Sequence, residues 1–204
     1  MKSFIKNMIL VSLAAGSAAA HAQSAPNLDL VGVTHAGTGC PAGSLSFEMG
    51  EYRDQVAIRL SGSDFVAETG PGVSLSASRK ACQMLADVRI TDGWQYRVMA
   101  VAYSGHAELG SGVSGLIRTS YYFQGQLETA SDSRSLYGPD YLDLFDIADF
   151  SSQDVWSPCG LQRALNLKIS ASVRGFRGQR GMIAMDDPMG IDPSFILIET
   201  RRCQ

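Results

Sequence analysis

Apolar and polar residues alternate along most of this chain, which is the pattern of half-buried β-strands. The clearest case is residues 165–174, where aliphatic residues occupy every second position and polar or charged residues lie between them. Residues 82–90 alternate in the same way and place Cys82 on their apolar face. Further strands are predicted at residues 28–33, 45–47, 55–60, 95–103, 113–127, 181–185 and 195–202.

Turn sequences separate these segments, among them Gly70-Pro71-Gly72, Ser104-Gly105 and Gly110-Ser111-Gly112. No segment shows an apolar helical stripe longer than one or two turns. Many short alternating strands with frequent turns predict an all-β fold with little helix. We expect an antiparallel two-layer β-sandwich, immunoglobulin-like or jelly-roll-like. The chain lacks internal repeats and low-complexity linkers, so residues 23–204 are predicted to form a single domain.

The first 22 residues have the pattern of an export signal. Lys2 and Lys6 give a positive start, residues 8–20 are apolar and small, and Ala20-His21-Ala22 suits signal peptidase. The later sequence has no apolar run of the roughly 18 residues that a membrane span needs. No cysteine stands immediately after the predicted cleavage point, so a lipoprotein anchor is not indicated. The protein is therefore expected to be secreted or periplasmic.

Four cysteines remain after this signal: Cys40, Cys82, Cys159 and Cys203. An even number in an exported protein indicates two disulfides, and four cysteines allow three pairings. The separations from 40 to 82 and from 159 to 203 are similar, which favours those two bonds. The absence of a C-x-x-C sequence argues against redox catalysis and against a zinc ribbon.

Charge narrows the choice of partners. The whole chain has 17 Lys and Arg against 20 Asp and Glu, a net charge of −3. Without Lys2 and Lys6 the count becomes 15 against 20, or −5. A mildly acidic chain argues against nucleic acid as a partner. The Arg-Gly-rich residues 174–181 are interpreted as a hairpin turn rather than as an RNA-binding segment.

An acidic stretch interrupts the alternation at residues 137–156, which carry five aspartates and no basic residue. Apolar residues lie between the acids, so we expect a packed excursion with a helical turn. Asp140, Asp143, Asp146 and Asp149 are candidate calcium ligands, since loop carboxylates supply the oxygens that calcium prefers. The EF-hand spacing is missing. A solvated acidic patch that meets a basic partner is the alternative, and no other cofactor is predicted.

A candidate binding surface comes from residues 113–127. Val113, Ile117, Tyr121, Phe123 and Leu127 are expected to face the core. The opposite face would then carry Arg118, Tyr122, Gln124 and Gln126. An aromatic ring beside amides and a guanidinium suits stacking on a sugar and hydrogen bonding to its hydroxyls. An ordinary solvated sheet face is the alternative.

Several short motifs resemble, in their order, a secreted family known as domain of unknown function 4360. They are Gly39-Cys40-Pro41, Gly70-Pro71-Gly72, Ser78-Arg79-Lys80-Ala81-Cys82-Gln83, Tyr121-Tyr122-Phe123-Gln124-Gly125-Gln126, Trp156-Ser157-Pro158-Cys159-Gly160 and Arg202-Cys203. The resemblance covers residues 31–203. It implies a small secreted protein with these four cysteines and no established activity. This chain departs from the family pattern in lacking a tryptophan shortly before Cys203.

The sequence favours a non-catalytic module that binds a glycan, a surface polymer or a protein. A Ser-His-Asp enzyme is disfavoured because the predicted mature chain holds two histidines, His35 and His106, and no G-x-S-x-G motif. A carboxylate-dependent glycoside hydrolase is the alternative, using acids of residues 140–154 or Asp186, Asp187 and Asp192. A third hypothesis is a secreted inhibitor or effector protein.

Overall fold

The computed structural model describes residues 26–50, 55–60, 65–139, 141–176, 178–185 and 194–204. Side chains are described throughout these ranges except at 55–60, 141–143 and 150. The predicted export signal lies outside them. Within these ranges, no helix is long and apolar enough to cross a membrane.

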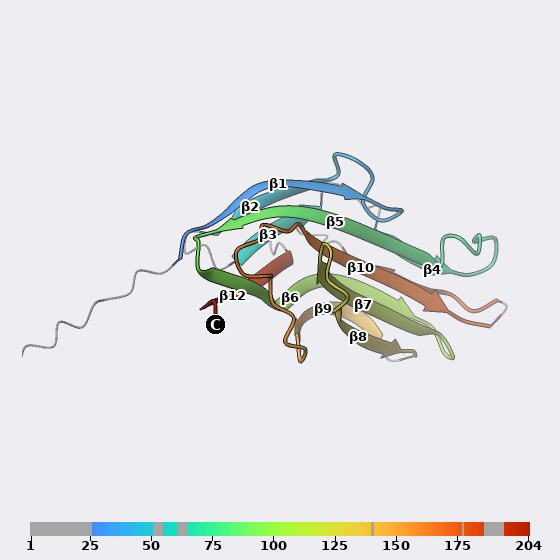
Figure 1. The fold of residues 1–204 in the computed structure, drawn as a ribbon. Coiled ribbons are helices and arrows are strands. Elements are labelled where there is room, and N and C mark those ends of the chain that lie inside the picture. Colours follow the sequence, from blue (N-terminus) through green and yellow to red (C-terminus); the bar gives the residue numbers. More distant parts are fainter. Residues whose placement is uncertain (1–25, 51–54, 61–64, 140, 177, 186–193) are drawn as a thin grey trace, which may run out of the picture.

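The described chain is built from β-strands, which confirms the predicted all-β class (Figure 1). The strands are β1 (Leu28–Ala36), β2 (Leu45–Met49), β3 (Gln55–Leu60), β4 (Val66–Thr69), β5 (Arg79–Ile90), β6 (Trp94–Leu109), β7 (Ser114–Phe123), β8 (Ala130–Tyr137), β9 (Tyr141–Phe150), β10 (Leu165–Arg174), β11 (Gly181–Ala184) and β12 (Ser194–Arg202). Strand β10 has the predicted bounds because its buried and exposed residues alternate along nearly its whole length.

The strands form two antiparallel sheets. One contains five strands in the order β1-β5-β10-β7-β8. The other has the order β2-β3-β12-β6-β11-β4, with β9 also paired to β6. Because β9 pairs with residues 100–109 of β6, it occupies one edge of that strand. Strands β12 and β11 therefore follow one another along the opposite edge.

The two sheets pack face to face and enclose one apolar core. Tyr96 of β6 and Phe123 of β7 meet across it edge to face, with ring centroids 5.2 Å apart. Gly115 allows close approach of the layers, since a Cβ there would lie 2.3 Å from Ile183 Cδ1. The structure thus confirms the predicted β-sandwich.

Both predicted disulfides are present. Cys40 bonds to Cys82 and ties the turn after β1 to β5, with Cα atoms 5.3 Å apart. Cys159 bonds to Cys203 and ties the segment after β9 to the residue after β12, with Cα atoms 5.8 Å apart. Each bond therefore joins segments that are distant in sequence.

Several local predictions were wrong. Strand β6 runs straight through the predicted turn at Ser104-Gly105, because Gly105 serves close packing: a Cβ there would lie 2.1 Å from the Ala184 carbonyl oxygen. The acidic excursion is a strand, β9, which hydrogen-bonds along β6. Residues 174–181 are not a hairpin turn, because β10 and β11 belong to different sheets.

Candidate functional site

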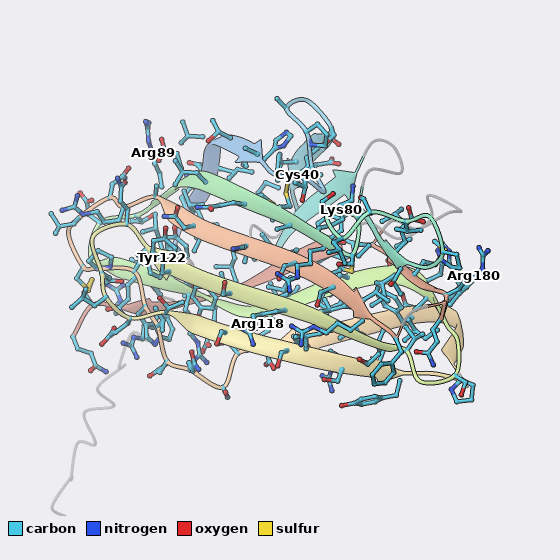
Figure 2. All side chains as sticks on the ribbon, turned by 90° about the vertical axis from the view of Figure 1, so that its right-hand side faces the viewer. Cys40, Lys80, Arg89, Arg118, Tyr122 and Arg180 are labelled. Atoms are coloured by element: carbon cyan, nitrogen blue, oxygen red, sulfur yellow. A yellow bond between two sulfur atoms is a disulfide. The ribbon has the colours of Figure 1, made fainter. Side chains whose placement is uncertain are left out.

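The outer side of the five-stranded sheet is an open, polar surface, seen face on in Figure 2. Strand register aligns its outward-facing residues in rows. Each row takes one residue from β5, one from β10 and one from β7, in that order: Leu85, Asn166 and Tyr122; Gln83, Lys168 and Ser120; Ala81, Ser170 and Arg118; Arg79, Ser172 and Leu116. A fifth row contains only Arg174 of β10 and Ser114 of β7. Strand β8 extends the last four rows with Ser131, Ser133, Ser135 and Tyr137. We call these residues the basic face.

The charged residues of the basic face are all cations. Lys168, Arg118, Arg79 and Arg174 are exposed, and the rows defined above contain no Asp or Glu. None of the four makes a salt bridge with another described residue. The face is therefore positive although the whole chain is acidic.

A hollow of about 190 Å³ lies at the end of the basic face away from Tyr122. Its lining includes Ser114, Ser135 and Ser172, the ring of Tyr137 and the side chain of Arg174. Tyr137 is 67% exposed, so its ring is accessible from solvent. The face thus carries one tyrosine at each end and serine hydroxyls between them.

The predicted site residues separate into two pairs. Arg118 and Tyr122 do share the outer side of β7, about 13 Å apart along the strand. Gln124 and Gln126 lie beyond the end of β7, in a turn at Gly125, where φ is +83°. This turn ends the alternation early, so Leu127 is fully exposed and the prediction that it faces the core was wrong.

The acidic stretch does not form the predicted helical turn. Because β9 is a strand, Asp146 and Asp149 point to opposite sides, the first exposed and the second buried. The side chain of Asp143 and all of Asp140 lie outside the described part of the chain. Among the described residues, no three His, Cys, Asp or Glu side chains gather as metal ligands.

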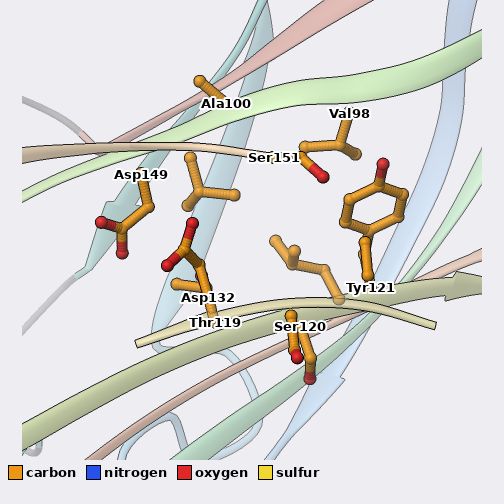
Figure 3. Close-up of a pocket in the computed structure, with 12 residues that line it drawn as sticks. Val98, Ala100, Thr119, Ser120, Tyr121, Asp132, Asp149 and Ser151 are labelled. Carbon is orange, nitrogen blue, oxygen red and sulfur yellow. The ribbon is translucent and has the colours of Figure 1, made fainter. Parts of the chain in front are cut away.

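Asp149, which lines a small cavity (Figure 3), is instead buried and forms an ion pair with Arg134 of the other sheet. The Tyr103 hydroxyl donates to Asp149 Oδ2 at 2.7 Å, and Arg134 Nη2 donates to Oδ1 at 3.0 Å. Burial, and then the bond to this carboxylate, raise the pKa of Tyr103. The carboxylate also raises the pKa of Arg134. The adjacent cavity of about 20 Å³ has space for one water, not for a sugar.

Other acids that were candidates for catalysis have structural partners. Asp154 accepts from Arg97 Nη1 at 2.8 Å and also from the Trp156 indole nitrogen. The guanidinium of Arg201 stacks on the Trp156 ring, 3.8 Å from its centroid. Asp186, Asp187 and Asp192 fall outside the described residues.

A cleft of about 450 Å³ on the other sheet was not predicted, because β4 itself was missed. Glu68 of β4 and Glu108 of β6 both pair with Met182 of the intervening strand β11. They therefore lie in one row on the outer face, with backbones about 10 Å apart. Arg180 also lines this cleft.

The model of the family described as a domain of unknown function (DUF4360) matches residues 26–203. This chain belongs to the DUF4360 family. An uncharacterized secreted protein of Arthroderma benhamiae is 39% identical over 179 residues, covering 84% of this chain and 70% of that protein.

Among solved structures, TmCBM61 in complex with beta-1,4-galactotriose is similar at 13% identity. That match covers 86% of this chain and 91% of the other, with a TM-score of 0.31. A likeness this distant carries no argument about the function of a DUF4360 protein.

Most motifs that carried the resemblance have structural roles in this DUF4360 chain. Four contain disulfide cysteines, and Gly70-Pro71-Gly72 turns the chain between β4 and β5. The Tyr121-Tyr122 pair divides between the two sides of β7. Tyr121 is in the core, whereas Tyr122 lies on the basic face.

Proposed function

We propose that this exported protein is a non-catalytic module that binds a glycan on its basic face. The observation that carries the proposal is the combination of the half-buried Tyr122 ring and a run of hydroxyls on an open sheet surface. Aromatic rings stack on the apolar faces of sugars, while serine hydroxyls both donate and accept hydrogen bonds. The surface is long enough for several sugar residues, because β7 from Ser114 to Tyr122 spans about 27 Å.

The fold supplies rigidity for such a surface. Strands β10 and β7 pair with each other along their whole length, and the opposite sides of both strands are buried in the core. Binding groups on paired strands need little ordering when a ligand arrives, so less affinity is lost to conformational entropy.

The test is titration calorimetry of the full chain, exported into an oxidising compartment, against a panel of soluble polysaccharides. Tyr122→Ala should weaken binding by about tenfold or more, the usual result for loss of an aromatic anchor. Leu144→Ala is the matched control, since it truncates an exposed side chain on β9 of the other sheet. Equal affinities for the native chain and Tyr122→Ala would refute the site.

The cleft with Glu68 and Glu108 favours a second candidate, carbohydrate hydrolysis. Inverting glycosidases hold two carboxyl groups about 6.5 to 9.5 Å apart, and two glutamates in one row of a cleft supply the carboxyl groups for such a pair. Release of reducing sugar that is abolished by both Glu68→Gln and Glu108→Gln would support it. Saturable binding without sugar release would favour the non-catalytic module.

A further inference from the structure

We infer that the glycan held by the basic face is a polyanion whose sugar units bear carboxylate or sulfate groups. This inference rests on the proposed function and names the ligand class of the same surface. It is carried by the spacing of the cations, by the absence of acidic partners for them among the described residues and by the chemistry of the residues between them.

The four cations occupy four successive rows. Lys168 lies in the row next to Tyr122, followed by Arg118, Arg79 and Arg174, one in each row. Successive rows are two residues apart, or about 7 Å along the strands. Measured along the strand direction, the face therefore presents one positive charge about every 7 Å over about 20 Å, with the cations distributed over β10, β7 and β5. A regular series of charges is complementary to a polymer with repeated anionic groups.

In the part of the chain that the structure describes, these four cations form no salt bridge that would stabilise the fold. Elsewhere on the molecule, Arg97 pairs with Glu199 and Asp154, and Arg134 pairs with Asp149. The cations of the basic face have no such acidic partner among the described residues. Because the fold holds these like charges near one another, they repel, and a bound anionic ligand would reduce this repulsion.

The residues between the cations favour a sugar polymer over a nucleic acid. Proteins that bind single strands stack successive bases on a series of aromatic rings, whereas the centre of this face carries Ser120, Ser170 and Ser172. Duplex-binding domains are strongly basic as a whole, whereas this chain has a pI of about 5.6. Arginine forms paired hydrogen bonds with carboxylate and sulfate oxygens, and the serines match sugar hydroxyls.

The experiment compares polygalacturonate, dextran sulfate and neutral dextran as ligands of the full chain by calorimetry, at low and at high salt. We expect the polyanions to bind at least about tenfold tighter than dextran at low salt, and we expect added salt to weaken them. The two polyanions distinguish carboxylate from sulfate recognition. The double change Arg118→Gln with Lys168→Gln should reduce polyanion binding by about tenfold. The swap Arg118→Lys with Lys168→Arg should retain most of it.

Arg163→Gln is the matched control, because it removes an exposed cation from the connection before β10 rather than from the face. Suppose that dextran and the polyanions bind equally well, that salt has no effect and that Tyr122→Ala still weakens binding. This result would overturn the inference of a polyanion and would still support the proposed function. Absence of binding to every polysaccharide would overturn both. Binding of a DNA oligonucleotide as tight as the better polyanion, and lost in the double variant, would overturn the choice of a glycan.

Discussion

Asp149 offers the sharpest test of what holds the two sheets together. Its carboxylate is completely buried, whereas the side chain of its partner Arg134 is 52% exposed. Removing the carboxylate leaves the buried Tyr103 hydroxyl without an acceptor, which costs about 1 to 3 kcal/mol. Breaking a buried ion pair costs about 3 to 5 kcal/mol, but Arg134 regains water on its exposed side, so the lower end applies.

Asp149→Ala should therefore lower the free energy of unfolding by about 3 kcal/mol. For a domain of this size that corresponds to a fall in Tm of roughly 6 to 12 °C. Asp149→Asn keeps an oxygen for Tyr103 and should cost less, about 1 to 2 kcal/mol. Urea unfolding followed by tryptophan fluorescence measures both changes.

The matched control is Asp146→Asn, the same chemical change three residues earlier on the exposed side of β9. It should alter the free energy of unfolding by less than about 0.5 kcal/mol. Arg134→Gln removes the other partner of the ion pair and leaves the buried Asp149 carboxylate without its cation, so it should also lower the free energy of unfolding. If Asp149→Asn and Asp146→Asn unfold at the same urea concentration, the reasoning about this ion pair is refuted.

Four further predictions concern stability. Cys82→Ser should lower the free energy of unfolding by about 4 kcal/mol, since it opens a loop with a sequence separation of 42, and an unchanged Tm would contradict this. Folding raises the pKa values of Tyr96 and Tyr103 above the value of 10.0 that these side chains have in the unfolded chain. The unfolded chain therefore loses these protons at a lower pH than the folded protein, and the free energy of unfolding, measured by urea titration, should fall as the pH rises above 10. Gly105→Ala places a Cβ against the Ala184 carbonyl and should cost about 1 to 3 kcal/mol, measured as a Tm decrease. Replacing EDTA with calcium should leave the Tm unchanged, because Asp146 and Asp149 point to opposite sides of β9 and Asp149 is paired with Arg134, and a saturable increase would support the calcium hypothesis instead.

The sequence predicted strands best where one face of a strand is buried. The alternation of β10 is regular because its neighbours β5 and β7 cover both edges and the core covers one side. Strand β8 was missed because its outer face is serine and its inner face holds Asp132 and Arg134, so little apolar signal remains. Strand β9 was missed because a segment rich in aspartate has the composition of a surface loop. Asp149 is nevertheless buried, because Tyr103 of β6 and Arg134 of β8 bond to its carboxylate.

The candidate site shows the same limit. Arg118 and Tyr122 were predicted because they belong to one strand, where alternation fixes the face. The contributions of Lys168 and Arg79 depend on the register between strands, which no local pattern determines. The Glu68 and Glu108 pair likewise needs β11 to lie between two segments that are distant in sequence.

The pairing of β6 has a consequence for how the protein matures. Its three partners β9, β11 and β12 all follow it in the chain, and Trp94 at its start pairs with Arg202 near the end of the sequence. The second sheet therefore cannot be completed until its last strand has been synthesised and exported, because β12 joins β3 to β6. The Cys159–Cys203 disulfide likewise needs Cys203, which follows β12, so it can form only after the last strand has reached the oxidising side.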